Sequence, residues 1–221
     1  MESYRTEEEQ VEALKRWWKE NGRGTVLGVV LALGLGFGWQ AWQRNQDAAA
    51  ANASLRFQQM LSGLASDDAA GEELAKSIAQ QLKDEHRGST YAQFAALHLA
   101  RLAVKDDNLA GAETELRWVL AMADGGGDVH QVAQLRLARV LAAQGDTDEA
   151  LTLLADGGGD YGASYAIARG DVLLASGREA DALEAFRMAA EAFKDEPSLP
   201  PGLSEKLQYL ESRQASAAEG G

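Results

Sequence analysis

Residue types that carry catalysis are scarce in this chain. The three histidines, His86, His98 and His130, lie 12 and 32 residues apart, and none has a partner three or four residues further on, as a zinc site on one helix needs. The sequence has no cysteine, so thiolate metal sites and cysteine nucleophiles are excluded. It has no nucleophile elbow and no phosphate-binding loop. We therefore predict that the protein is not an enzyme and uses no metal or cofactor.

Twenty residues without a charge, 24–43, predict a membrane-spanning helix. In a helix they extend about 30 Å, close to the thickness of a bilayer's hydrocarbon core. Tryptophans, whose rings favour the headgroup layer, stand at both ends: Trp17, Trp18, Trp39 and Trp42. A buried helix of a soluble protein is an alternative, but such helices seldom lack charge for so long.

A cleaved signal peptide is a second alternative, because Ala48-Ala49-Ala50 resembles a cleavage site. The segment before the apolar stretch is 23 residues long and carries six acids, whereas a signal peptide has a short basic start. We therefore predict an uncleaved signal anchor.

Basic residues predict the orientation of this anchor. Four lie close to its N-terminal end: Lys15, Arg16, Lys19 and Arg23. Only Arg44 and Arg56 lie near the other end. By the positive-inside rule, residues 1–23 stay in the cytoplasm and the rest is exported, which in a Gram-negative bacterium means a single-pass inner-membrane protein with a periplasmic domain.

Small residues recur every fourth position within the predicted span, at Gly28, Ala32 and Gly36. Such a stripe lets two helix backbones approach closely, so it predicts packing against another membrane helix, although glycine is common in membrane helices in any case. In the cytoplasmic segment, Thr6 and Glu9 have capping-box spacing before an apolar stripe of Val11, Leu14 and Trp18. This helix either lies on the membrane surface or docks a cytoplasmic partner.

We predict that the exported part forms one acidic, all-α domain over 44–214, followed by a disordered tail over 215–221. It has 16 basic against 28 acidic residues, a net charge of −12, which argues against nucleic acid and anionic lipid surfaces as partners. Its segments are rich in Ala and Leu and lack alternating β-branched runs. We expect two leading helices over about 47–65 and 70–84, with apolar faces of Phe57, Leu61 and Leu64 and of Leu74, Ile78 and Leu82.

Internal repeats decide the architecture of this domain. The six residues Ala-Asp-Gly-Gly-Gly-Asp occur at 123–128 and again at 155–160. Each repeat also has a pair of small residues twelve positions apart and a large apolar residue four positions after the second: Ala100, Ala112 and Leu116; Ala138, Ala150 and Leu154; Gly170, Ala182 and Phe186. Small pairs let the two helices of a hairpin pack closely. We predict three hairpins, over about 90–123, 128–156 and 160–194, and a capping helix over about 203–214.

This pattern resembles the tetratricopeptide repeat, a helical hairpin that stacks into a solenoid. The resemblance implies a partner-binding groove lined by the first helix of each hairpin. Its positions here are Phe94, Leu97, Arg101, Val132, Leu135, Arg139, Ile167 and Asp171. Apolar groups beside arginines suit a segment that carries carboxylates. The alternative is that the apolar members only pack neighbouring hairpins together.

Motifs along the whole chain resemble the YfgM family. They are Gln10-Val-Glu-Ala-Leu-Lys-Arg16, Glu20-Asn21-Gly22, Gly38-Trp39, Ala53-Ser54-Leu55 and Leu135-Arg136-Leu137-Ala138-Arg139-Val140. The resemblance implies an ancillary component of the SecYEG translocon that works with the membrane-anchored chaperone PpiD and helps pass exported polypeptides to periplasmic chaperones. A membrane-anchored signalling or envelope-assembly scaffold is the alternative, in which the cytoplasmic segment acts; deletion of residues 2–16 would abolish only that second function.

Overall fold

A computed structural model shows an all-α chain, as the sequence predicts, and describes residues 7–66, 68–155, 157, 159–195 and 198–219. No strand is found in these ranges. The chain divides into two compact units, Met1–Asn52 and Ala53–Gly221. The second unit, called the repeat domain below, therefore begins nine residues later than residue 44, the predicted start of the exported domain.

The first unit consists of most of helix α1 (Glu7–Ala65). Among the described residues, α1 is the one helix long and apolar enough to span a membrane, and none of its most apolar window is buried. Its large apolar side chains, such as Leu35 and Phe37, are exposed. The predicted stripe of Val11, Leu14 and Trp18 is exposed as well. Thr6 of the predicted capping box lies outside the described residues.

The last turns of α1 pair with α2 (Ala69–Glu85) and form a first hairpin of the repeat domain. Asp68 starts α2 by accepting a hydrogen bond from the backbone N–H of Gly71, as an N-cap residue should. Two residues of the predicted apolar faces are not buried: Leu61 is 39% exposed and Leu74 is 56% exposed. Met60 takes the buried position in place of Leu61, and Leu74 faces the outer side of this first hairpin.

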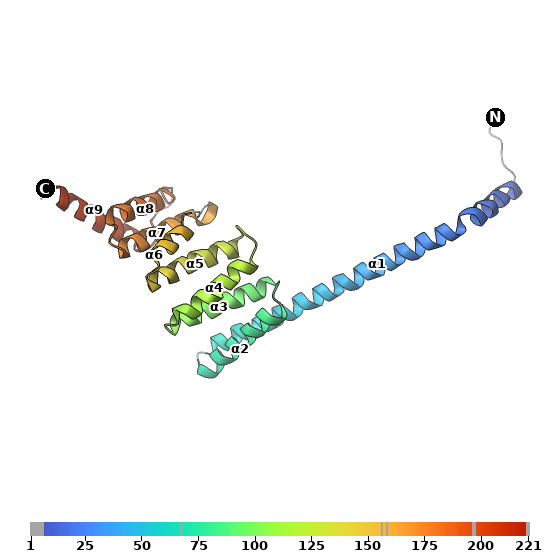
Figure 1. Cartoon of the computed structure of the whole chain (residues 1–221), viewed down its shortest axis with the longest axis horizontal. Helices are drawn as coiled ribbons and strands as arrows, with labels where there is room; N and C mark the ends of the chain where they lie inside the picture. The colour runs from blue at the N-terminus through green and yellow to red at the C-terminus, as the bar shows by residue number, and fades with distance from the viewer. Residues whose placement is uncertain (1–6, 67, 156, 158, 196–197, 220–221) are drawn as a thin grey trace, which may run out of the picture. The chain divides into compact units, whose positions relative to one another are not determined.

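The three predicted hairpins are confirmed and follow one another along the repeat domain (Figure 1). They are α3 (Thr90–Lys105) with α4 (Leu109–Met122), α5 (Asp128–Gln144) with α6 (Thr147–Leu153), and α7 (Gly162–Ala175) with α8 (Glu179–Glu191). A 3-10 turn, η1 (Gly159–Tyr161), leads into α7. Alanine and leucine dominate these segments and both favour helix, so local propensity and repeat pattern agree.

Close backbone approach holds each hairpin together. The paired small residues of all three hairpins are buried, and so are Leu116, Leu154 and Phe186, which follow them. Gly170 shows how little space remains, since a Cβ added there would lie 2.5 Å from the ring of Phe186. A side chain at this position would force the aromatic ring or the helix to move.

The turn within each hairpin needs a left-handed residue five positions before the second small residue. Gly145 and Gly177 adopt this conformation, with φ of 96° and 78°. In the first predicted hairpin the position is Asp107, the one non-glycine residue with positive φ among the described residues, at 58°. Aspartate is one of the few side chains that tolerate this region, which explains how the turn survives without glycine.

Helix α9 (Leu203–Glu219) covers the C-terminal end of the repeat domain. Leu203 and Leu210 are buried against the cluster that contains Phe186. The predicted helix ended near residue 214, and the predicted tail began at 215; the structure instead continues the helix to Glu219, while residues 220–221 lie outside the described part. The chain thus supplies its own capping helix, which solenoids need at their ends.

Candidate functional site: an arginine hollow on the repeat domain

The predicted groove residues fall into two classes in the structure. Leu97 and Leu135 are only 8% exposed and belong to the central core of the repeat domain, and Val132 and Ile167 pack partly buried against core clusters. Phe94 packs against the ring of Phe57, with centroids 6.0 Å apart. These apolar members pack hairpins together. Arg101 and Arg139, by contrast, are exposed and line one hollow.

This hollow has a volume of about 350 Å³ and is lined by residues of α3, α4 and α5, which belong to the second and third hairpins of the repeat domain. Arg101 of α3 and Arg136 and Arg139 of α5 provide its charges. The rest of its lining is apolar: Ala100, Val104, Leu109, Leu116, Val140 and Ala143. We call it the arginine hollow. None of the described residues that line it is acidic.

Its arginines differ from most basic residues of the repeat domain, because they have no acidic partner. Ten of the fifteen Lys and Arg residues in 53–221 form ion pairs. The five that form none, within the ranges that the structure describes, are Arg87, Arg101, Arg136, Arg139 and Arg169. Three of these five line the arginine hollow. In an acidic domain, so many uncompensated cations around one apolar surface indicate a site for an anionic group.

His98 reports the electrostatic potential of this region. Its half-buried imidazole lies 6.1 Å, centroid to centroid, from the ring of Phe57. The buried Nδ1 atom has no hydrogen-bond partner among the described residues. Burial lowers the pKa of His98, and the positive charges of Arg101 and Arg136 lower it further, because they oppose a third cation nearby. Both effects favour the neutral imidazole.

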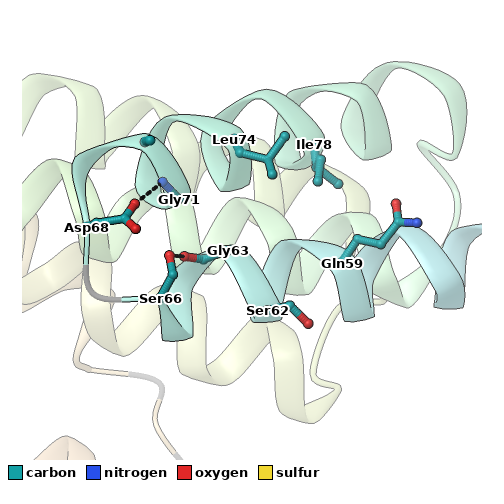
Figure 2. Close-up of a pocket in the computed structure, with 9 residues that line it drawn as sticks. Gln59, Ser62, Gly63, Ser66, Asp68, Gly71, Leu74 and Ile78 are labelled. Atoms are coloured by element: carbon teal, nitrogen blue, oxygen red, sulfur yellow. Dashed lines mark hydrogen bonds between the residues drawn. The ribbon is translucent and has the colours of Figure 1, made fainter.

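A larger hollow, the outer groove, lies between the end of α1 and α2 (Figure 2). Three of its polar side chains already form local hydrogen bonds: Asp68 accepts from the Gly71 backbone N–H, the Ser66 hydroxyl donates to the Gly63 carbonyl over 2.7 Å, and the Ser62 hydroxyl donates to the Gln58 carbonyl. Figure 2 shows Leu74 and Ile78 along its upper wall. The outer groove offers apolar surface but no unused charge, so it carries less chemical information than the arginine hollow.

The third predicted hairpin does not extend the arginine hollow. Asp171 accepts a hydrogen bond from the Lys206 ammonium of α9, which covers this end of the repeat domain. Asp171 therefore links α7 to the capping helix. No local pattern predicts this pair, because residue 206 lies 35 positions further along the chain.

Sequence reasoning missed Arg136, the third arginine of the hollow. The repeat alignment places it two positions before the small residue Ala138, where the neighbouring hairpins have His98 and Ala168. A search for groups of like charge on one helix face would have found it, because Arg136 and Arg139 are three residues apart and so lie on the same side of α5.

In the first unit, the predicted packing stripe has open space around it. A Cβ added to Gly28 or Gly36 would have no neighbour within 4 Å, and Ala32 is exposed. Among the described residues there is no group of three or more His, Asp or Glu side chains that could hold a metal ion.

Comparison with known proteins shows that the sequence belongs to a family. The sequence matches the family described as tetratricopeptide repeat-like domain over residues 15–212. It is 32% identical over 209 residues to a protein of Escherichia coli named "Ancillary SecYEG translocon subunit", covering 94% of this chain and 96% of that protein. Proteins with the same name from Haemophilus influenzae and Aggregatibacter actinomycetemcomitans are 31% and 33% identical, each over 84% of this chain and 89% of the relative. No solved structure matches the chain.

The electrostatic link between the hollow and His98 can be tested directly. Replacing Arg136 by Gln should raise the pKa of His98, because one of the two cations that disfavour its protonation is removed. The pKa should stay below the ordinary value of about 6.5, since burial, the larger cause, remains. The measurement is an NMR titration of the imidazole, with Arg87→Gln, an exposed arginine outside the hollow, as the control. An unchanged pKa in the Arg136 variant would contradict the proximity of the two groups.

Proposed function

The chain belongs to the YfgM family of ancillary SecYEG translocon subunits, and we propose that it works beside that translocon in the inner membrane as a non-enzymatic interaction protein. In this role it captures segments of exported polypeptides, or of the chaperones that receive them, among them PpiD. Its contribution is to help pass exported proteins from the channel to periplasmic chaperones.

The arginine hollow is the observation that carries this proposal. A binding site for polypeptide needs apolar surface for affinity and unsatisfied polar groups for orientation. The hollow provides both, because an apolar floor is surrounded by three arginines without ion pairs. No ion pair in the described repeat domain uses these three charges.

Charge reversal of Arg101 and Arg139 to Glu tests the site. Both side chains are exposed, so the melting temperature should shift by no more than a few degrees, since surface substitutions usually cost under about 0.5 kcal/mol. Partner capture should fall strongly, because two cations become anions. A photoreactive residue in place of Val104, which lines the hollow and is 46% exposed, makes the capture measurable as crosslinked partner in cells.

The matched control is reversal of Arg87 and Arg169, which changes the net charge equally and removes two exposed arginines that lie outside the hollow and form no ion pair within the described residues. It should leave crosslinking at position 104 unchanged. Equal loss in both double variants would show a general charge effect, and undiminished capture by the folded Arg101 and Arg139 variant would refute the hollow as the site.

The proposed role also requires the repeat domain to lie in the periplasm. We propose a single-pass protein with a cytoplasmic N-terminus, which is supported by the four basic residues that precede the apolar stretch. Protease added to spheroplasts should digest the repeat domain and leave a protected fragment that contains residues 1–23. Survival of the full chain in intact spheroplasts, with digestion after lysis, would reverse this orientation.

Packing of α1 against a membrane helix of the translocon is the second contact that we propose. Replacing Gly28 and Gly36 by Leu keeps the segment apolar but fills the open space along the stripe, so co-purification of the translocon should decrease. Leu replacement of Val26 and Val29, which are already large and exposed, serves as the control. Unchanged co-purification of the glycine variant would place the binding energy elsewhere in the chain.

A further inference from the structure

The size of the arginine hollow limits what it can hold. At about 350 Å³ it lies at the lower end of the range for small-ligand pockets, roughly 300 to 1,000 Å³. One or two large apolar side chains can enter it, whereas a folded element cannot. The occupant therefore presents a single apolar anchor rather than a broad apolar surface.

The charges around the hollow limit the neighbours of that anchor. Arg101 comes from α3 and Arg136 and Arg139 from α5, so cations stand on both helices that flank the apolar floor. A guanidinium binds a carboxylate through two parallel hydrogen bonds, and no acidic side chain in the described part of the chain lines the hollow to do so. Carboxylates of the occupant are the groups that fit.

We propose, building on the function above, that the arginine hollow selects an acidic segment of a dedicated protein partner, in which one large apolar side chain is flanked by carboxylates. Exported polypeptides in general share apolar residues but no such charge pattern. In a site that binds only exported polypeptides, three arginines without ion pairs would not increase the affinity for most segments. They would also repel the basic segments of those polypeptides. The hollow thus discriminates by charge as well as by apolar contact.

A short polypeptide fits better here than an anionic membrane surface. The exported part has a net charge of −12, so a large anionic surface meets overall repulsion. A segment of a few residues responds mainly to charges within about 8 Å at physiological salt, the distance over which screening acts. At that range the three arginines dominate.

Arg136 acts in this proposal as a specificity-determining residue. It contributes to the potential at His98 together with Arg101, so carboxylates that bind both arginines should offset their charge and raise the pKa of His98. The imidazole then serves as an internal reporter of occupancy, independent of any label on the ligand.

The probe is a twelve-residue fluorescent peptide with a central Phe and two Glu residues on each side, added to the full chain in detergent micelles. Two matched peptides replace all Glu by Gln, or the Phe by Ala. Fluorescence anisotropy should show at least about tenfold weaker binding for either matched peptide, because each loses charge-assisted hydrogen bonds or the apolar anchor. The Arg136→Gln variant should bind the acidic peptide more weakly by a similar factor and should bind the Gln peptide as well as the unchanged protein does. The Arg87→Gln variant should bind both peptides with unchanged affinity. The acidic peptide should also raise the pKa of His98.

Equal binding of the acidic and Gln peptides, or no effect of Arg136→Gln, would overturn the proposed selectivity. Displacement of the peptide by inorganic phosphate, but not by sodium chloride of equal ionic strength, would assign a phosphate site instead and overturn it as well. These results leave the proposed function intact if crosslinking at position 104 still depends on Arg101 and Arg139. If the peptides behave as expected but no chaperone or exported protein is crosslinked, the proposed function fails and the selectivity stands.

Discussion

Close backbone approach within each helical hairpin is the constraint on which the rest of the repeat domain depends. Two small residues, twelve positions apart, must face each other, and a left-handed turn between them must return the chain at the right angle. Gly170 shows how strict the first condition is, because a Cβ there would collide with Phe186. Asp107 shows that the turn requires a positive φ and not glycine itself, since this aspartate adopts the left-handed conformation. With the inner faces fixed in this way, one outer face of α3 and of α5 remains free to carry side chains that do not serve the fold.

The distribution of charge shows which side chains these are. Most cations of the repeat domain are paired, in many cases across helices, as in Arg213 with Glu179 of α8 and Lys83 with Glu115 of α4. Such pairs neutralise part of the acidic surface and join neighbouring elements, although each exposed pair contributes at most about 1 kcal/mol. The three arginines of the hollow take no part in this pairing. Since they form no ion pair with the described residues of the fold, their gathering around an apolar floor is better explained by binding than by stability.

The sequence predicted the hairpins well because their constraints are local and periodic. Arg101 and Arg139 could be placed on one surface since both stand one position after a small residue that the fold buries. Features that depend on a distant neighbour were not predictable. The repeat alignment places Asp171 in the groove, because no local pattern indicates that Lys206 reaches it. Helical periodicity places Leu74 on an apolar face with Ile78 and Leu82, but the structure leaves it 56% exposed beside the outer groove. Periodicity identifies which residues share one face of a helix but not which neighbouring element packs against that face.

The proposed anchoring determines how strongly the arginine hollow needs to bind. Residues 44–52, which connect the predicted span to the repeat domain, lie within helix α1, and nine helical residues extend only about 14 Å. If the proposed anchoring holds the chain beside a channel, confinement to that membrane surface gives an emerging segment an effective concentration on the order of 1 mM at the hollow. A Kd of about 0.1 mM is then enough for frequent occupancy, and with an association rate constant of about 10⁶ M⁻¹ s⁻¹ such a complex lasts roughly 10 ms. A deep, enclosed pocket would hold its ligand far longer. A small apolar hollow with charges at its edge therefore suits brief capture and release, which is what transfer between a channel and a chaperone requires.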